Sequence, residues 1–395
     1  MTQRTTRFRV LASVYWSSAS EGDGARVMAA LTLQSVEQAL AKLVDPVFER
    51  PMSELGLLSD VKLDGRRLSL RVQLSAPAGA SKERITRDLQ ELVGPLGVHE
   101  VDLLWDLQVP ARQASADDPV PEVRNIVLVM SGKGGVGKST CAFNLALALS
   151  QAGARVGALD ADIYGPSLPT MMGVHGNPRS LDGKRIEPLR RLGVTLMSIG
   201  FMLEDPKQAV IWRGPMLQGA LQQFLGDVNW GTLDYLILDL PPGTGDVALT
   251  LAQRLRTTGV VIVTTPQEVA LQDVYKAVSM CDKLKLRVLG VLENMSYFVD
   301  PQGARHEIFG AGGGQKVADY AKAPLLGQIP IDPLVRQWGD DGTPVVEAAP
   351  KSTVASAFRD VAERLATRIA REHFVASGGQ KAPPVAGHKR LKIIR

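Results

Sequence analysis

A glycine-rich segment near the middle of the chain, SGKGGVGKST, contains two lysines, Lys133 and Lys138. Its spacing, G-x-x-x-x-G-K-S, is that of a loop that wraps the phosphates of a nucleotide. Lys138 would reach the β- and γ-phosphates, and the Ser139 hydroxyl would bind Mg²⁺. The residues predicted to bind nucleotide in this segment are Gly132, Lys133, Gly134, Gly135, Val136, Gly137, Lys138, Ser139 and Thr140.

The elements on either side of this loop must present it to a ligand. The apolar, β-branched run NIVLVM (125–130) predicts a buried strand, and STCAFNLALALSQAG after the loop has helical spacing that stops at Gly153. Strand, glycine loop and helix together predict a P-loop, in which backbone N–H groups and the helix N-terminus attract a phosphate.

Acidic residues end two further predicted strands. Asp239 ends the apolar run of LILDLPPGTGD, where a carboxylate can hold Mg²⁺ through a water, and Gly243 and Gly245 free the next loop to respond to a γ-phosphate. LDADIYGPS places Asp160 and Asp162 at the end of another strand. We expect Asp162 to orient an attacking water or a metal-bound water. Asp160 fits that role and a helix-capping role equally well.

Strands and helices alternate from residue 125 onward. The predicted strands are 155–162, 233–241, 259–266, 287–295 and 325–332. Continuous apolar strands separated by helices predict an α/β P-loop NTPase fold, with a mostly parallel, doubly wound sheet covered on both faces. Ligands of such sheets bind at the carboxyl ends of the strands, where these motifs fall. A last amphipathic helix, with Phe358, Val361, Leu365 and Ile369 on one face, is predicted to pack on the core.

The length of 395 residues predicts more than one domain. Residues 28–108 form a predicted small α+β domain, 109–123 a linker, 124–375 the nucleotide-binding domain, and 376–395 a basic, disordered tail. Residues 1–27 are rich in Arg and Ser and contain no acid before Glu21. They fit a transit peptide, a weak signal peptide or a misassigned start codon, and we favour the last.

Composition argues against several classes of function. The net charge is +4, but the five basic residues after Ala376 supply +5, so the rest sums to −1 and predicts no nucleic-acid-binding body. No apolar run has the length of a membrane span. The two cysteines, Cys141 and Cys281, cannot form a disulfide framework and predict a cytoplasmic location, with each thiol a small buried apolar group.

The stretch KGGVGKST resembles the deviant Walker A motif of the MinD/ParA/nitrogenase-iron-protein class of P-loop ATPases. In that class the extra lysine, here Lys133, reaches across a face-to-face homodimer to the phosphates of the other subunit. Hydrolysis then depends on assembly, because the second cation arrives only in the closed dimer. The resemblance therefore implies a slow ATPase with ATP and Mg²⁺ as ligands and with Lys133, Lys138 and Asp162 as catalytic residues.

Within that class, the chain resembles the Mrp/ApbC-type iron–sulfur cluster carriers. The stretches that carry the resemblance include DADIYGPSLPTMMG (160–173), WRGPM (212–216), LDLPPGTGD (238–246), VLENMSYF (291–298) and IPIDPLVR (329–336). The resemblance implies contacts of Asn294, Pro330 and Asp332 with the adenine base, a switch role for Asp162, and apo iron–sulfur proteins or assembly factors as partners. The N-terminal unit resembles the small SufT/PaaD-like domain.

The chain departs from the family pattern where metal ligands are expected. Asp300 and Gly303 stand where the family has a C-x-x-C pair, and Gly79 replaces a cysteine of the small domain. Asp300 and His306 could offer oxygen and nitrogen ligands, which suit an iron–sulfur cluster less well than thiolates do. We identify no cluster ligands in the sequence, and expect an ATPase cycle that does not hold a cluster in the usual way.

Other functions remain open at this point. A ParA- or MinD-like positioning ATPase, with a nucleic-acid or membrane partner, gains some support from the tail HKRLKIIR. The stretches DIYGPS and WRGP and the small N-terminal domain argue against it, so we expect neither partner. A scaffold that binds ATP without turnover conflicts with the intact motif residues. A metabolic kinase would need a second substrate-binding motif, which the sequence lacks.

Overall fold

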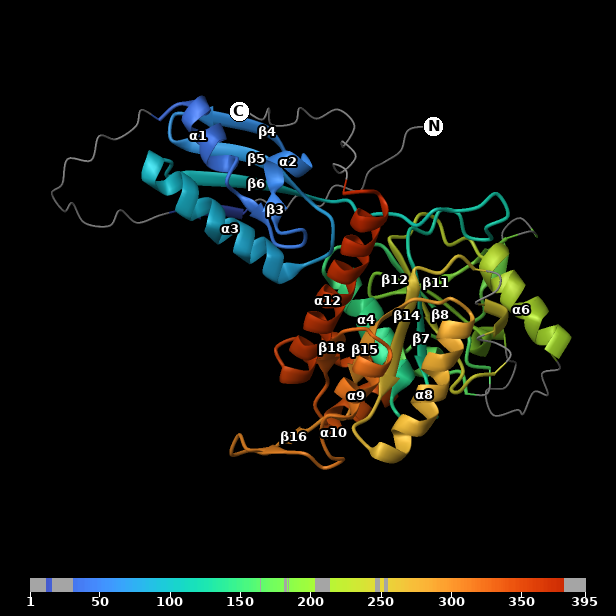
Figure 1. The fold of residues 1–395 in the computed structure, drawn as a ribbon. Helices are drawn as coiled ribbons and strands as arrows, with labels where there is room; N and C mark the ends of the chain where they lie inside the picture. The colour runs from blue at the N-terminus through green and yellow to red at the C-terminus, as the bar shows by residue number, and fades with distance from the viewer. Residues whose placement is uncertain are drawn as a thin grey trace. The chain divides into compact units, whose positions relative to one another are not determined.

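The computed structural model places most of the chain in two compact units (Figure 1). It describes residues 12–15, 31–163, 165–180, 183, 185–202, 214–245, 249–251 and 255–379. The small unit comprises Met1–Pro110 with Ala370–Arg395, and the large unit comprises Ala111–Ile369. Of the two predicted terminal segments, residues 1–11, 16–27 and 380–395 lie outside the described residues.

The small unit is built on a four-stranded sheet with the order β1-β6-β5-β4. Its elements are β1 Ala12–Tyr15, α1 Leu33–Leu40, β2 Val44–Asp45, β3 Arg50–Pro51, α2 Met52–Leu55, β4 Leu58–Asp64, β5 Arg67–Leu74, α3 Gly79–Val93, a 3₁₀ turn at Gly94–Leu96, and β6 Glu100–Leu107. β4 and β5 form a hairpin, with Asp64 paired to Arg67 across the turn at Gly65. β5 and β6 run parallel, which requires the crossover through α3.

The core of the small unit lies between this sheet and its helices. Val36 and Leu40 of α1 and Ile85 and Leu89 of α3 are fully buried in one apolar cluster with the sheet. β1 pairs antiparallel with β6, from Ala12 opposite Leu103 to Tyr15 opposite Glu100. Part of the segment that we predicted as an extension is therefore an edge strand of this sheet.

Residues from Ala370 onward group with the small unit, although the sequence assigned residues up to 375 to the nucleotide-binding domain. The Phe374 ring stacks on Phe48 with centroids 4.5 Å apart. Arg371 donates to the Val47 carbonyl and pairs with Glu49 at 2.6 Å. The boundary falls inside one helix, Thr353–Ala376 (α12), so helical periodicity could not reveal it.

The large unit is built on an eight-stranded sheet with the order β11-β12-β8-β13-β7-β14-β15-β18. Its strands are β7 Ile126–Ser131, β8 Val156–Asp160, β11 Leu189–Arg191, β12 Val194–Ser198, β13 Tyr235–Asp239, β14 Gly259–Thr264, β15 Val288–Glu293 and β18 Leu325–Gln328. All neighbours are parallel except β11 and β12. The mostly parallel α/β sheet predicted from the sequence is confirmed.

Helices follow the strands of the large unit and cover the sheet. They are α4 Lys138–Gln151, α5 Leu168–Met171, α6 Gly214–Gly226, α8 Glu268–Lys283, α9 Gly313–Tyr320, α10 Pro333–Asp340, α11 Val345–Ala348 and α12. Short pairs, β9 Arg179–Ser180 with β10 Ile186–Glu187 and β16 Phe298–Val299 with β17 Arg305–His306, lie outside the main sheet. α4 packs against β8 and β13, and α8 packs against β7 and β14. The predicted apolar face of α12, Phe358, Val361, Leu365 and Ile369, is fully buried.

The predicted linker is more ordered than its composition suggests. Ala111 and the residues that follow it group with the large unit. Arg112 and Asp118 form a buried ion pair, and Arg112 also donates to the Val120 carbonyl at 2.8 Å. Val120 and Val123 are themselves buried, so much of this segment packs as part of the nucleotide-binding unit.

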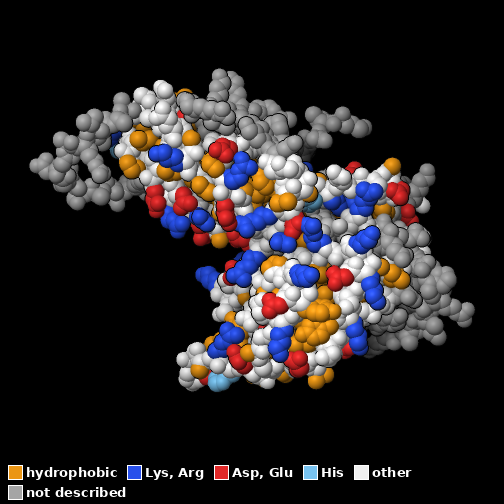
Figure 2. Space-filling model, in the orientation of Figure 1, with side chains coloured by type: hydrophobic (Ala, Val, Ile, Leu, Met, Phe, Trp, Pro, Cys, Tyr) orange, Lys and Arg blue, Asp and Glu red, His pale blue; other side chains and the backbone are white. Residues whose placement is uncertain are grey.

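Charges of both signs lie on the surface of the described residues. On the face seen in Figure 2, basic and acidic side chains are interspersed over the described elements of both units. No helix in the described part of the chain combines the length and the apolar character needed to cross a membrane.

Candidate functional site

The glycine loop joins the end of β7 to the start of α4, as predicted. Gly137 has φ of +79°, a left-handed conformation that favours glycine. A Cβ at Gly132 would lie 2.3 Å from the backbone nitrogen of Val274 in α8. A Cβ at Gly137 would lie 2.2 Å from Nδ2 of Asn294. The loop is therefore held between two neighbouring segments that leave no room for side chains at these positions.

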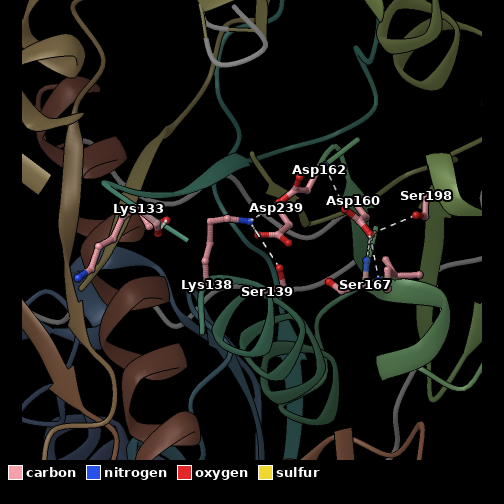
Figure 3. A network of polar contacts seen from close by, with 10 residues as sticks. Lys133, Lys138, Ser139, Asp160, Asp162, Ser167, Ser198 and Asp239 are labelled. Carbon is pink, nitrogen blue, oxygen red and sulfur yellow. Dashed lines mark hydrogen bonds and ion pairs between the residues drawn. The ribbon is translucent and has the colours of Figure 1, made fainter. Parts of the chain in front are cut away.

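Lys138 is buried between two carboxylates at the first turn of α4 (Figure 3). Its Nζ lies 2.6 Å from Oδ1 of Asp239 and 3.7 Å from Oδ2 of Asp162. The Ser139 hydroxyl lies 3.5 Å from the same Nζ. The structure thus brings together the four side chains that the sequence assigned to phosphate, Mg²⁺ and water.

The carboxylates of this cluster retain coordinating capacity. Burial raises the pKa of Asp239, while the neighbouring Lys138 lowers it. Within the described part of the chain, Oδ2 of Asp239 and Oδ1 of Asp162 are buried and accept no hydrogen bond. Mg²⁺ prefers oxygen ligands and takes one or two carboxylates beside phosphate and water. These two oxygens and the Ser139 hydroxyl therefore fit Mg²⁺.

Asp160, for which the sequence left two roles open, has a full set of local partners. Its Oδ1 accepts from the Asp162 N–H, and its Oδ2 accepts from the Ser167 and Leu168 N–H groups and from the Ser198 hydroxyl, all within 2.9–3.1 Å. Burial and the nearby Asp239 carboxylate raise the pKa of Asp160, although the backbone donors lower it. The geometry favours an anchoring role, in which Asp160 holds the loop that carries Asp162.

Asp160→Asn is expected to lower the free energy of unfolding by about 1–3 kcal/mol, because the new NH₂ group would face hydrogen-bond donors in a buried site. Urea unfolding of the large unit measures this change. Asp273→Asn is the matched control, since Asp273 is partly exposed and, among the residues that the structure describes, forms its one ion pair with Lys276 on the same helix. A change within about 0.5 kcal/mol is expected there. Equal effects of the two substitutions would contradict the anchoring role.

Lys133 is oriented differently from Lys138. Its side chain extends away from the Lys138–Asp239 cluster (Figure 3). Its backbone carbonyl accepts from the Ser131 hydroxyl at 2.9 Å, which fixes the start of the loop. Among the residues that the structure describes, no carboxylate pairs with the Lys133 ammonium group. The extra lysine therefore does not take part in the acidic cluster of its own subunit.

Of the segments predicted to contact the base, the one with Asn294 lies next to the glycine loop, and the one over 329–332 lies next to the residues that follow Asn294. Asn294 donates from Nδ2 to the Val136 carbonyl at 2.9 Å. The Ile331 N–H donates to the Tyr297 carbonyl, which pairs the 329–332 segment with the chain after β15. Asp332 caps α10 by accepting from the Leu334 N–H at 2.9 Å. Pro330 and Asp332 are thereby placed on the segment that follows β18.

A buried acid that no sequence motif revealed organises this region. Glu293 ends β15 and is fully buried. It accepts from the Ser296 hydroxyl at 2.5 Å, from Gln328 Nε2 at 2.7 Å and from the Gly314 N–H. It therefore joins the ends of β15 and β18 to the start of α9. The sequence sign of this buried acid is a single charged residue at the end of an apolar strand, in VLENM.

The position of the missing C-x-x-C pair is a closed turn between β16 and β17. Oδ1 of Asp300 accepts from the N–H groups of Gln302 and Ala304 at 3.0 and 2.8 Å. Its Oδ2 lies 2.7 Å from Nε2 of His306. Gly303 has φ of +88° and donates to the Asp300 carbonyl. Asp300 and His306 are thus paired with each other at an exposed hairpin.

Comparison with known proteins shows the family to which the chain belongs. Residues 122–366 match the family described as NUBPL iron-transfer P-loop NTPase, and residues 33–103 match the family of iron–sulfur cluster assembly proteins. The chain is 43% identical over 347 residues to an "Iron-sulfur cluster carrier protein" of Synechocystis, covering 86% of this chain and 98% of the relative. It is 46% identical over 336 residues to a Deinococcus radiodurans protein of the same name, covering 84% and 94%.

A solved structure also resembles part of the chain. A nucleotide-binding protein from Archaeoglobus fulgidus, determined in complex with ADP, is 42% identical with a TM-score of 0.50, and the match covers 56% of this chain and 87% of that one. The family match spans more than half of the chain, and it includes the glycine loop and the strand-end acids Asp160, Asp162 and Asp239. The chain therefore belongs to the NUBPL iron-transfer family of P-loop NTPases.

Proposed function

We propose that this P-loop NTPase is an ATP-hydrolysing carrier or assembly factor for iron–sulfur clusters that acts as a face-to-face homodimer. Its relatives in Synechocystis and Deinococcus radiodurans are named as cluster carriers, and they cover most of this chain. The arrangement of the two lysines is the observation that supports the proposal of a dimer. Lys138 lies within the acidic cluster, whereas the Lys133 side chain extends away from it, as a lysine that serves the phosphates of a second subunit would.

Each residue of the site has a role in the proposed hydrolysis. Lys138 would exchange its contact with Asp239 for the β- and γ-phosphates of ATP. Ser139 and Asp239 would hold Mg²⁺, which neutralises charge on the phosphate oxygens. Asp162 would orient a water that attacks the γ-phosphorus, so that the bond to the β–γ bridging oxygen breaks and ADP and inorganic phosphate leave. Lys133 of the second subunit would neutralise the charge that develops on the transferred group.

We further propose that Asn294, Pro330 and Asp332 surround the adenine base. Asn294 already contacts the glycine loop, and the 329–332 segment pairs with the chain that follows it. Since the Asp332 carboxylate caps α10, its contact with the base would come from the remaining carboxylate oxygen or from its main chain. Residues 111–369 would then contain every group that binds the nucleotide.

The proposed partners are apo iron–sulfur proteins or other assembly factors, met in the cytoplasm. The small domain supports this proposal, because it matches a family of iron–sulfur cluster assembly proteins. The mixed surface charge in Figure 2 gives no support to a nucleic-acid partner. We therefore place the function with cluster carriers rather than with positioning ATPases.

ATP hydrolysis by the full-length protein is expected to require both Mg²⁺ and dimerisation. Phosphate release should stop on addition of EDTA and return with excess Mg²⁺. Without the ion that Ser139 and Asp239 would hold, the negative charge of the phosphate oxygens is not neutralised. The rate per subunit should rise with protein concentration as dimers form, with light scattering reporting the mass of the ATP complex. A monomer whose rate per subunit is independent of concentration would contradict the proposal.

A further inference from the structure

The two cysteines are the only thiols of the whole chain, and both are enclosed in the large unit. Cys141 lies in the first turns of α4, directly after the phosphate-binding loop, and its side chain is fully buried. Cys141 is therefore not exposed to an incoming cluster.

Cys281 is enclosed in the same way on α8. Its side chain is fully buried, as are Val274, Ala277 and Val278 on the same helix. Burial, with a contribution from Asp282, raises the pKa of Cys281 to about 12. The expectation that both cysteines are small buried apolar groups is confirmed. A cluster on either thiol would require the helix to leave the sheet.

The other metal-binding side chains do not replace the missing thiolates. Iron–sulfur clusters are held by several cysteine thiolates, with histidine as an occasional substitute. Asp300 and His306 bond to each other, and the second oxygen of Asp300 holds its own turn. In the described part of the chain, no group of three or more His, Cys, Asp or Glu side chains is placed to bind a metal ion.

We infer that this chain holds no iron–sulfur cluster on its own side chains, and that a partner protein supplies the thiolates for any cluster that it handles. The inference rests on the proposed function. ATP binding and hydrolysis would then control the binding of a protein, and not the binding of a cluster to this chain. The dimer would capture and release a protein that presents a cluster on its own cysteines, or the apoprotein that receives one.

Accessibility of the thiols gives the first test. Under anaerobic conditions, the folded protein should show no thiol that reacts with an aromatic disulfide reagent over several minutes, with or without Mg²⁺ and ATP. The same protein in guanidinium should show both. Cys141→Ser and Cys281→Ser assign any signal to one residue. Rapid reaction of either cysteine in the folded protein, in either nucleotide state, would overturn the inference.

Cluster reconstitution gives the second test. The full chain is incubated anaerobically with iron and sulfide and then desalted, and its visible absorbance and acid-labile sulfide are measured. An apo-ferredoxin whose four cysteines hold a [4Fe–4S] cluster, treated in parallel, controls for the chemistry. We expect loss of both signals from this chain on desalting. A stoichiometric [4Fe–4S] spectrum that survives desalting would overturn the inference, whether or not a variant with both cysteines changed to serine retains it.

ATPase activity is measured on the same preparation, so that the two proposals can fail separately. Mg²⁺-dependent hydrolysis without a retained cluster supports both of them. Hydrolysis with a stable cluster removes the inference and leaves the proposed carrier function intact. A preparation that binds no ATP and hydrolyses none would contradict the proposed function, while the result of the thiol titration would still stand.

Discussion

Lys133→Ala should bind ATP within about threefold of the wild type and hydrolyse it at least roughly 10³-fold more slowly. The Lys133 side chain extends away from the cluster that Lys138 forms with Asp239 and Asp162. Its removal should therefore leave the binding site of its own subunit intact. A cation supplied in trans to a transferring phosphoryl group acts mainly on the transition state, and such a cation contributes about 10³–10⁵ in rate.

Binding of a fluorescent ATP analogue and steady-state phosphate release measure the two effects separately. Lys351→Ala is the matched control, because Lys351 is an exposed lysine that precedes α12 and forms no ion pair within the described residues. That variant should keep both wild-type properties. Hydrolysis by Lys133→Ala at the wild-type rate would show that this lysine is only a loop residue.

Lys138→Ala should lose both ATP binding and hydrolysis. Charge-assisted hydrogen bonds from one ammonium group are worth about 1.5–3 kcal/mol, so the affinity should fall by roughly 10- to 100-fold or more. Hydrolysis should become undetectable. Titration calorimetry with ATP and Mg²⁺ checks the affinity directly, and an unchanged affinity would contradict the assignment.

The same substitution should also destabilise the protein when no nucleotide is added. Lys138 is 6% exposed and faces two carboxylates, of which Asp239 is fully buried. Removing one partner of a buried ion pair costs about 3–5 kcal/mol. The pKa of Asp239 is already raised by burial, and loss of the cation would raise it further. The loss of unfolding free energy in Lys138→Ala should therefore be largest at a pH above the raised pKa of Asp239. It should shrink as the pH falls through that pKa, because protonation of Asp239 removes the uncompensated negative charge.

The sequence predicted the site well where local chemistry determines it. The site lies at the carboxyl ends of parallel strands, where the structure brings together the glycine loop, Lys138, Asp239 and Asp162. This location could be predicted because apolar runs and the acids that end them are visible without tertiary information. The sequence left Asp160 undecided, since its partners Ser167 and Ser198 come from a loop and from a separate strand.

Elements that depend on distant contacts were missed. β12 has only five residues and was not among the predicted strands, although it pairs with β8 along its whole length. The role of Glu293 could not be predicted from the sequence, because its donors, the Gln328 side chain and the Gly314 N–H, come from distant parts of the chain. The end of α12 groups with the small unit through Phe374 and Arg371, and amphipathic spacing carries no information about which unit a helical turn contacts.

Mixing two inactive variants tests the trans role of Lys133 most directly. Lys133→Ala and Asp162→Asn are each expected to be inactive as homodimers. A heterodimer of the two has one site with an intact Asp162 that receives Lys133 from the other subunit. Random pairing in a two-fold dimer makes about half of the dimers mixed, each with one complete site of two, so about a quarter of wild-type phosphate release should return. A mixture that forms heterodimers, seen by mass spectrometry, yet stays as inactive as its components would contradict catalysis in trans.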